Sequence, residues 1–265
     1  MINVFRSLNY YVRKDLAIVI AFITIASLPI VSLSFMSALE GLSLSDMTGA
    51  VYFAEMNRDV VIISLVAALL IATRLVGTDF SDRSVNYEIL GGNRRITSYL
   101  GRIAAGLLWG CIVCWILMSL PLGYLSLING WGVTVDIKWA LFRQVLMFLP
   151  LLRFVSLLIF VTILVRGAGK GMALAVVILE VEAIIDTMFE EILDIKIKYA
   201  LAASNLMRVL GLDNAKNMVI DGKQVNVYIA DLPGNFVAAT IAVSLIMTVM
   251  YLSVAALVFL RKDRD

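Results

Sequence analysis

Residues 103–128 read IAAGLLWGCIVCWILMSLPLGYLSLI, an apolar run without one charged side chain. A helix that crosses the hydrocarbon core of a membrane needs about 20 mostly apolar residues. The whole chain agrees with this reading, because 61% of its 265 residues are hydrophobic, 16% are charged and its mean hydropathy is +0.94. Soluble domains are about half apolar and about a quarter charged. The sequence therefore predicts an all-α polytopic membrane protein and excludes a disordered chain.

Further runs on both sides of this one are long and apolar enough to cross a membrane. The six predicted transmembrane helices are Leu16–Leu39, Val60–Val76, Ile103–Ile128, Leu141–Val165, Met172–Phe189 and Phe236–Leu260. Lysine and arginine are dense before the first span, between spans two and three, between spans four and five, and after span six. Positively charged short loops face the cytoplasm. We expect both termini to be cytoplasmic and residues 1–265 to form a single transmembrane domain.

The N-terminal segment 1–15 is predicted to be an interfacial helix. Val4, Phe5 and Leu8 share one face of such a helix, and Asn9 lies on the opposite face. This amphipathic pattern favours a helix along the inner leaflet, with its apolar face toward lipid and Asn9 toward water. A frayed tail is the alternative.

Residues 190–234 form the longest predicted extracellular segment. Tyr199–Leu210 has helical periodicity and ends at Gly211. Asp221-Gly222 then lies between two runs of alternating apolar residues, which predicts a β-hairpin. Long ordered loops on a scaffold usually have a role.

The predicted cytoplasmic loop 77–100 contains a short apolar helix pattern. Its apolar side chains are spaced three and four residues apart, at Val85, Tyr87, Ile89 and Leu90. Gly91-Gly92 then ends the helix before the next span. A helix with an apolar face outside the membrane favours a protein partner, and an ordinary loop with an incidental helix is the alternative.

This arrangement resembles the membrane subunit of type-2 ABC exporters, whose permeases combine an N-terminal interfacial helix with six spans. In that family, the loop between spans two and three holds a coupling helix that docks onto a cytoplasmic ATPase. The residues that carry the resemblance are Phe80, Ser81, Val85, Tyr87, Glu88, Ile89, Leu90, Gly91, Arg94, Arg95, Tyr99 and Arg102. The resemblance implies that ATPase coupling falls to Phe80, Asp82, Val85, Tyr87, Glu88, Ile89, Leu90 and Arg94.

The resemblance also implies partners and a location. It implies a bacterial plasma membrane, a second copy of the permease and two ABC ATPase subunits, which would bind ATP and Mg. This chain is then no enzyme and holds no cofactor. Its nearest approach to a phosphate-binding G-x-x-x-x-G-K-[ST] loop is Arg166–Gly171, which lacks the first glycine and the hydroxyl residue.

The expected cargo is an amphipathic or hydrophobic molecule. Compact permeases of this kind export lantibiotics and phenol-soluble modulins or provide immunity to them, so we expect a peptide. A drug or lipid exporter is the near alternative. An ion-coupled secondary transporter is a more distant one, because no internal repeat with broken helices is apparent.

Among the charged residues inside predicted spans, four are functional candidates, because ionisable groups are costly there. Arg153 lies in span four, and Glu180, Glu182 and Asp186 lie in span five. Counting outward from the turn near Ala168 places Arg153 and Glu182 at nearly equal depth, with Glu180 the second choice. The group is either a structural ion pair or the polar lining of a substrate path or gate.

Metal and redox chemistry have little support in the sequence. The chain has no histidine, and its two cysteines, Cys111 and Cys114, lie within the apolar run with no charged neighbour. Zinc would need about two more ligands. We expect both cysteines to act as small apolar side chains on one helix face, and we predict no metal site.

Overall fold

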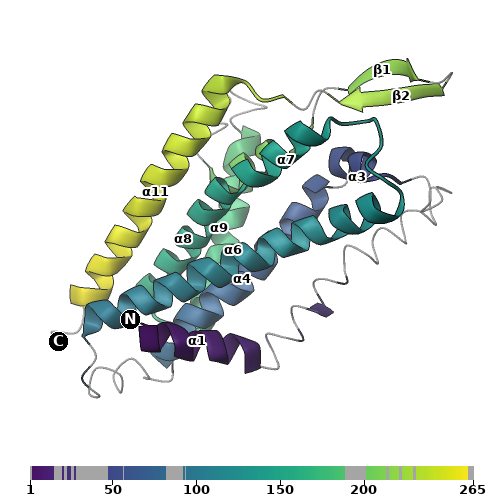
Figure 1. The fold of residues 1–265 in the computed structure, drawn as a ribbon. Coiled ribbons are helices and arrows are strands. Elements are labelled where there is room, and N and C mark those ends of the chain that lie inside the picture. The colour runs from purple at the N-terminus through teal and green to yellow at the C-terminus, as the bar shows by residue number, and fades with distance from the viewer. Residues whose placement is uncertain are drawn as a thin grey trace.

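The computed structural model is a bundle of long helices with a small hairpin at one end (Figure 1). It describes residues 2–14, 20, 23–24, 27, 47–55, 57–81, 92, 94–188, 201–212, 215–220, 223–228 and 231–261. The described ends of the chain lie at the end of the bundle opposite to the hairpin (Figure 1).

Four of the described helical segments are long and apolar enough to cross a membrane. They are Val60–Gly77 within α4 (Asn57–Ser81), α6 (Arg95–Ile128), α7 with α8 (Ile137–Leu146 and Phe148–Val165), and α11 (Gly234–Arg261). These four match predicted spans two, three, four and six. The helical, membrane-type fold class is therefore confirmed at this level.

The other two predicted spans have different outcomes. Span five is a helix, α9 (Ala168–Thr187), but it is not one of the four apolar segments, because it contains three carboxylates and Lys170. Span one, Leu16–Leu39, lies almost wholly outside the described residues.

Predicted span four is divided into α7 and α8 at Met147. Pro150 explains the break, because proline has no N–H for the carbonyl of Leu146 and its ring crowds that carbonyl. Met147 keeps helical backbone angles and donates its N–H to the carbonyl of Arg143 at 2.9 Å. The two helices therefore follow each other closely.

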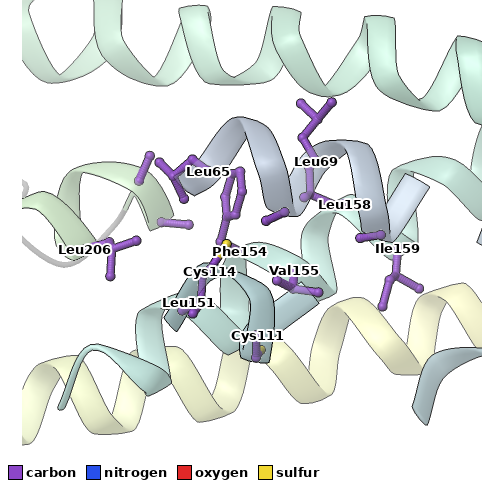
Figure 2. Close-up of a cluster of buried hydrophobic side chains, with 14 of the residues drawn as sticks. Leu65, Leu69, Cys111, Cys114, Leu151, Phe154, Val155, Leu158, Ile159 and Leu206 are labelled. Carbon is purple, nitrogen blue, oxygen red and sulfur yellow. The ribbon is translucent and has the colours of Figure 1, made fainter. Parts of the chain in front are cut away.

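The centre of the bundle is apolar and tightly packed. Figure 2 shows side chains from α4, α6, α8 and α10 (Ala202–Leu210) converging around Phe154 of α8. Cys111 and Cys114 lie in this cluster as free, buried thiols, and the Cys114 thiol donates to the carbonyl of Ser64 at 2.8 Å. Their predicted apolar role is confirmed.

Two glycines let α6 approach its neighbours closely. A Cβ on Gly110 would lie 2.9 Å from Val155 of α8, and one on Gly106 would lie 3.1 Å from Ile159 and 3.2 Å from Val76. Small residues four apart on one face allow this kind of helix contact in membranes.

The N-terminal helix α1 (Ile2–Lys14) has the predicted extent, and part of its apolar face packs on α6. Val4 and Leu8 are buried against Ala105 of α6. Asn9 accepts a hydrogen bond from the indole N–H of Trp109 at 3.1 Å, so it does not face water alone. The expected contact of Leu8 with lipid was wrong, because the sequence pattern distinguishes apolar from polar faces, while α6 supplies an apolar surface as suitable as lipid.

The segments at the hairpin end agree with the predicted local structure. Helix α3 (Gly49–Glu55) precedes α4, and α10 ends at Gly211 as predicted. Strands β1 (Ala215–Ile220) and β2 (Lys223–Tyr228) pair antiparallel, with Ile220 opposite Lys223. The predicted hairpin is therefore confirmed on both sides of Asp221-Gly222, a pair that lies outside the described residues.

Candidate functional site

The predicted coupling residues fall mostly outside the described residues. Asp82, Val85, Tyr87, Glu88, Ile89 and Leu90 all lie there. Phe80 belongs to α4, which continues through Ser81 and so is longer than predicted span two. Gly92 has the positive φ of 91° that a glycine turn permits, and Arg94 is exposed in extended backbone before α6. The coupling role of this loop stays a prediction.

Two of the predicted charged candidates, Glu182 and Asp186, contact the short helix α10. This helix is buried among α4, α7, α8 and α9, and it contributes Ala202, Leu206 and Val209 to the central apolar cluster. Residues 190–234 are therefore not simply an external segment, because α10 packs into the bundle. The sequence predicted the helix but not its burial.

Glu182 of α9 caps the N-terminus of α10. Its carboxylate oxygens accept hydrogen bonds from the backbone N–H groups of Ala202 and Ala203 at 3.4 and 3.1 Å. The preceding Leu201 makes no side-chain cap of its own. The first N–H groups of a helix need acceptors, and negative charge is favourable there. A carboxylate from another helix meets both needs.

Arg143 of α7 caps the opposite end of α10. Its guanidinium donates to the carbonyls of Val209 at 3.0 Å and Gly211 at 2.7 Å, and its side chain is buried. Positive charge is favourable at a helix C-terminus. Helix α10 is thus held between an anion at one end and a cation at the other, each supplied by a different helix.

Two further contacts fix the sides of α10. Arg208 forms an ion pair with Asp186 of α9, with an N–O distance of 3.3 Å. The Thr240 hydroxyl of α11 donates to the side-chain oxygen of Asn205 at 3.3 Å. The acidic face of α9 therefore binds α10 through both Glu182 and Asp186, which are four residues apart.

Arg153 of α8 lies close to this network and is buried, with 1% of its surface exposed. It interacts electrostatically with Glu182 and hydrogen-bonds the Tyr251 side chain of α11. The predicted proximity of Arg153 and Glu182 therefore holds, although Glu182 is shared with α10. Glu180, the second-choice partner, is exposed.

Sequence reasoning missed the cation that caps α10. Neither Arg143 nor Arg208 was among the candidate site residues. The available signal was Arg143 within the apolar stretch Trp139–Pro150, because an isolated cation among apolar residues needs a buried acceptor. Arg102 was placed in the cytoplasm, yet it is buried in α6 and donates to the side chain of Ser98.

The charged side chains of this site hold α10 against α7 and α9. Among the described residues, no group of three histidine, cysteine, aspartate or glutamate side chains could hold a metal ion. The chain matches no known protein-family model and no curated protein sequence. The fold and composition define its class as a helical membrane protein.

Proposed function

We propose that the chain is the permease subunit of an ATP-driven exporter that moves amphipathic or hydrophobic molecules, with peptides as the expected cargo. The support is the resemblance of its loops and spans to type-2 ABC exporter permeases. In this proposal, a second permease and two cytoplasmic ABC ATPases complete the complex in a bacterial plasma membrane. ATP and Mg bind the ATPase subunits.

The structural observation that best supports transport is the buried helix α10 with its charged restraints. Charged carboxylate and guanidinium groups are energetically costly at bilayer depth, and charged residues there are therefore candidates for a functional role. A short helix that several longer helices restrain by polar contacts can change position when those helices move. Such a helix is suited to closing a path between α9 and α11.

The ATPase partnership is tested by coexpressing the chain with the ABC ATPase that this proposal expects in a neighbouring reading frame. Charged substitutions at Val85, Tyr87 and Ile89 should leave membrane insertion intact but abolish copurification of the ATPase. Tyr10→Asp is the matched control, since Tyr10 is 66% exposed on α1, at the same end of the bundle as the start of α6 (Figure 1). Unchanged copurification of the loop variants would refute the docking proposal.

The cargo is tested separately, with the reconstituted complex. Amphipathic peptides, drugs and lipids are compared for their effect on ATP hydrolysis. Stimulation by peptides alone supports the proposed cargo, and stimulation by drugs or lipids supports the near alternative. Uptake driven by an ion gradient without any ATPase would instead identify a secondary transporter.

A further inference from the structure

Strand β2, the loop before α7 and the start of α7 lie at one end of the bundle (Figure 1). Residues of these segments line a cavity of about 680 Å³. The aromatic side chains of Trp131, Trp139 and Tyr228 line it, together with the carboxylates of Asp136 and Asp231. The other described lining residues are glycine or aliphatic, and none of the lining residues in the described part of the chain is lysine or arginine. The cavity therefore combines aromatic faces with negative charge.

The walls of this cavity are held by hydrogen bonds between separate segments. The carbonyl of Trp131 accepts from the N–H of Ala50 at 2.7 Å, and its indole N–H donates to the carbonyl of Val135 at 2.6 Å. The N–H of Tyr228 donates to the carbonyl of Thr134 at 2.9 Å, which joins β2 to the loop before α7. The aromatic side chains are thus carried by a fixed backbone.

A small apolar core supports the same walls from behind. Tyr52 and Phe53 of α3 are buried there with Leu125 of α6, and Trp131 and Tyr228 pack against this cluster. The rings of Phe53 and Trp131 are 6.4 Å apart and tilted by 46°. This packing holds Trp131 and Tyr228 in place in the absence of a ligand.

Asp136 and Tyr228 also make contacts within the protein. Asp136 caps α7 by accepting the N–H of Lys138 at 2.9 Å, a bond that uses only one of its oxygens. The Tyr228 side chain is hydrogen-bonded to Glu55. The pKa of its phenol is raised, mainly by burial and secondly by the nearby Glu55 carboxylate. Tyr228 is therefore neutral at physiological pH and presents an uncharged ring.

We propose that this cavity binds an organic ammonium cation. Aromatic faces attract ammonium groups through their π electrons, and carboxylates neutralise the charge. The volume lies within the range of about 300–1,000 Å³ typical of small-ligand sites. The ligand is either a free quaternary ammonium compound or a lysine side chain presented by a peptide. The site does not depend on the proposed partnership with an ATPase.

Calorimetric titration of the full chain in an uncharged maltoside detergent tests the site. The probes are choline chloride, an end-blocked tetralysine peptide and 3,3-dimethylbutan-1-ol, the neutral isostere of choline, all at matched ionic strength. Choline, the peptide or both should bind saturably, whereas the neutral isostere should bind at least roughly tenfold more weakly. Choline binding alone identifies a small-molecule site, and preferential peptide binding identifies a lysine site.

Point variants test what the carboxylate charges contribute to cation binding while the fold is kept. Asp136→Asn retains a good helix cap, so it removes charge while α7 keeps its start. Asp136→Asn and Asp231→Asn should each weaken binding of the cation roughly tenfold, and Trp139→Leu should weaken it similarly. Trp115→Phe is the control, because Trp115 contacts Phe148 at a ring distance of 5.7 Å and does not line the cavity.

Three results would overturn the proposal. The first is the absence of saturable binding by both cationic probes. The second is equal binding of choline and its neutral isostere, which would show a merely apolar cavity. The third is unchanged affinity in both asparagine variants that retain the melting temperature of the parent protein.

Discussion

Replacing Glu182 with alanine should destabilise the protein through α10. The carboxylate accepts the N–H groups of Ala202 and Ala203, which are 0% and 7% exposed, and it interacts with the buried Arg153. A buried donor that loses its acceptor costs about 1–3 kcal/mol, and breaking a buried charge pair costs about 3–5 kcal/mol. Since Glu182 is partly exposed and these losses overlap, we expect about 3 kcal/mol.

This loss is measurable as thermal unfolding in detergent, followed by circular dichroism. For a chain of this size, about 2–4 °C per kcal/mol implies a fall in Tm of roughly 10 °C. Glu180→Ala is the matched control, because Glu180 is exposed on the same helix and should change stability by less than about 0.5 kcal/mol. Glu182→Gln keeps one acceptor oxygen without charge and should fall between the two.

Equal melting temperatures for Glu182→Ala and Glu180→Ala would refute this account of α10. A double-mutant cycle with Arg153→Met then measures the pair itself, and absence of coupling would remove the electrostatic link. If the pair is structural, the double variant should regain transport and the part of the stability that Glu182→Ala loses by stranding Arg153, but not the part it loses by leaving Ala202 and Ala203 without an acceptor. If the carboxylate contacts a cationic substrate, the double variant should fold and remain inactive.

Three further changes test other contacts. Gly110→Ala places a Cβ 2.9 Å from Val155 and should lower the free energy of unfolding by about 1–3 kcal/mol, as measured by thermal unfolding. Gly123→Ala, in the same helix with open space around it, should be neutral or slightly stabilising. Equal effects of the two variants would contradict the close contact at Gly110. Arg143→Leu should lower Tm by roughly 5–10 °C, because it removes the donor to the buried carbonyl of Val209 and the partly buried carbonyl of Gly211; an unchanged Tm would contradict this role. The pKa of Tyr228 is raised in the folded protein, so its contribution to stability is complete below the unfolded pKa of about 10 and is lost as pH rises through the folded pKa. Tyr228→Phe should abolish this alkaline loss of stability in a pH titration of Tm. A loss that persists in the variant would assign the effect to another group.

The long helices could be predicted because bilayer depth and hydrophobic length constrain them strongly. Predicted Ile103–Ile128 lies within α6, and predicted Phe236–Leu260 lies within α11. The hairpin was also predictable, since Asp221-Gly222 fits a two-residue turn between strands. These features depend on local sequence and on the membrane, and neither requires knowledge of which helices are neighbours.

The position of α10 could not be predicted for the opposite reason. Its periodicity shows an apolar face, but a short amphipathic helix packs equally well on a membrane surface or inside a bundle. What decides its location is the pair of caps from Glu182 and Arg143, which are 39 residues apart in sequence. The error for α1 has the same origin, because α6 and lipid offer similar apolar surfaces to Leu8.

The restraints on α10 make its position sensitive to small movements of the long helices. Glu182 holds one end from α9, and Arg143 holds the other from α7. A shift of α9 along its axis by one residue, about 1.5 Å, can carry the carboxylate beyond hydrogen-bond distance of Ala203, unless α10 follows. If α10 follows, the contacts of Arg143 with Val209 and Gly211 lengthen instead. Relative sliding of α7 and α9 therefore has to break one cap or move α10.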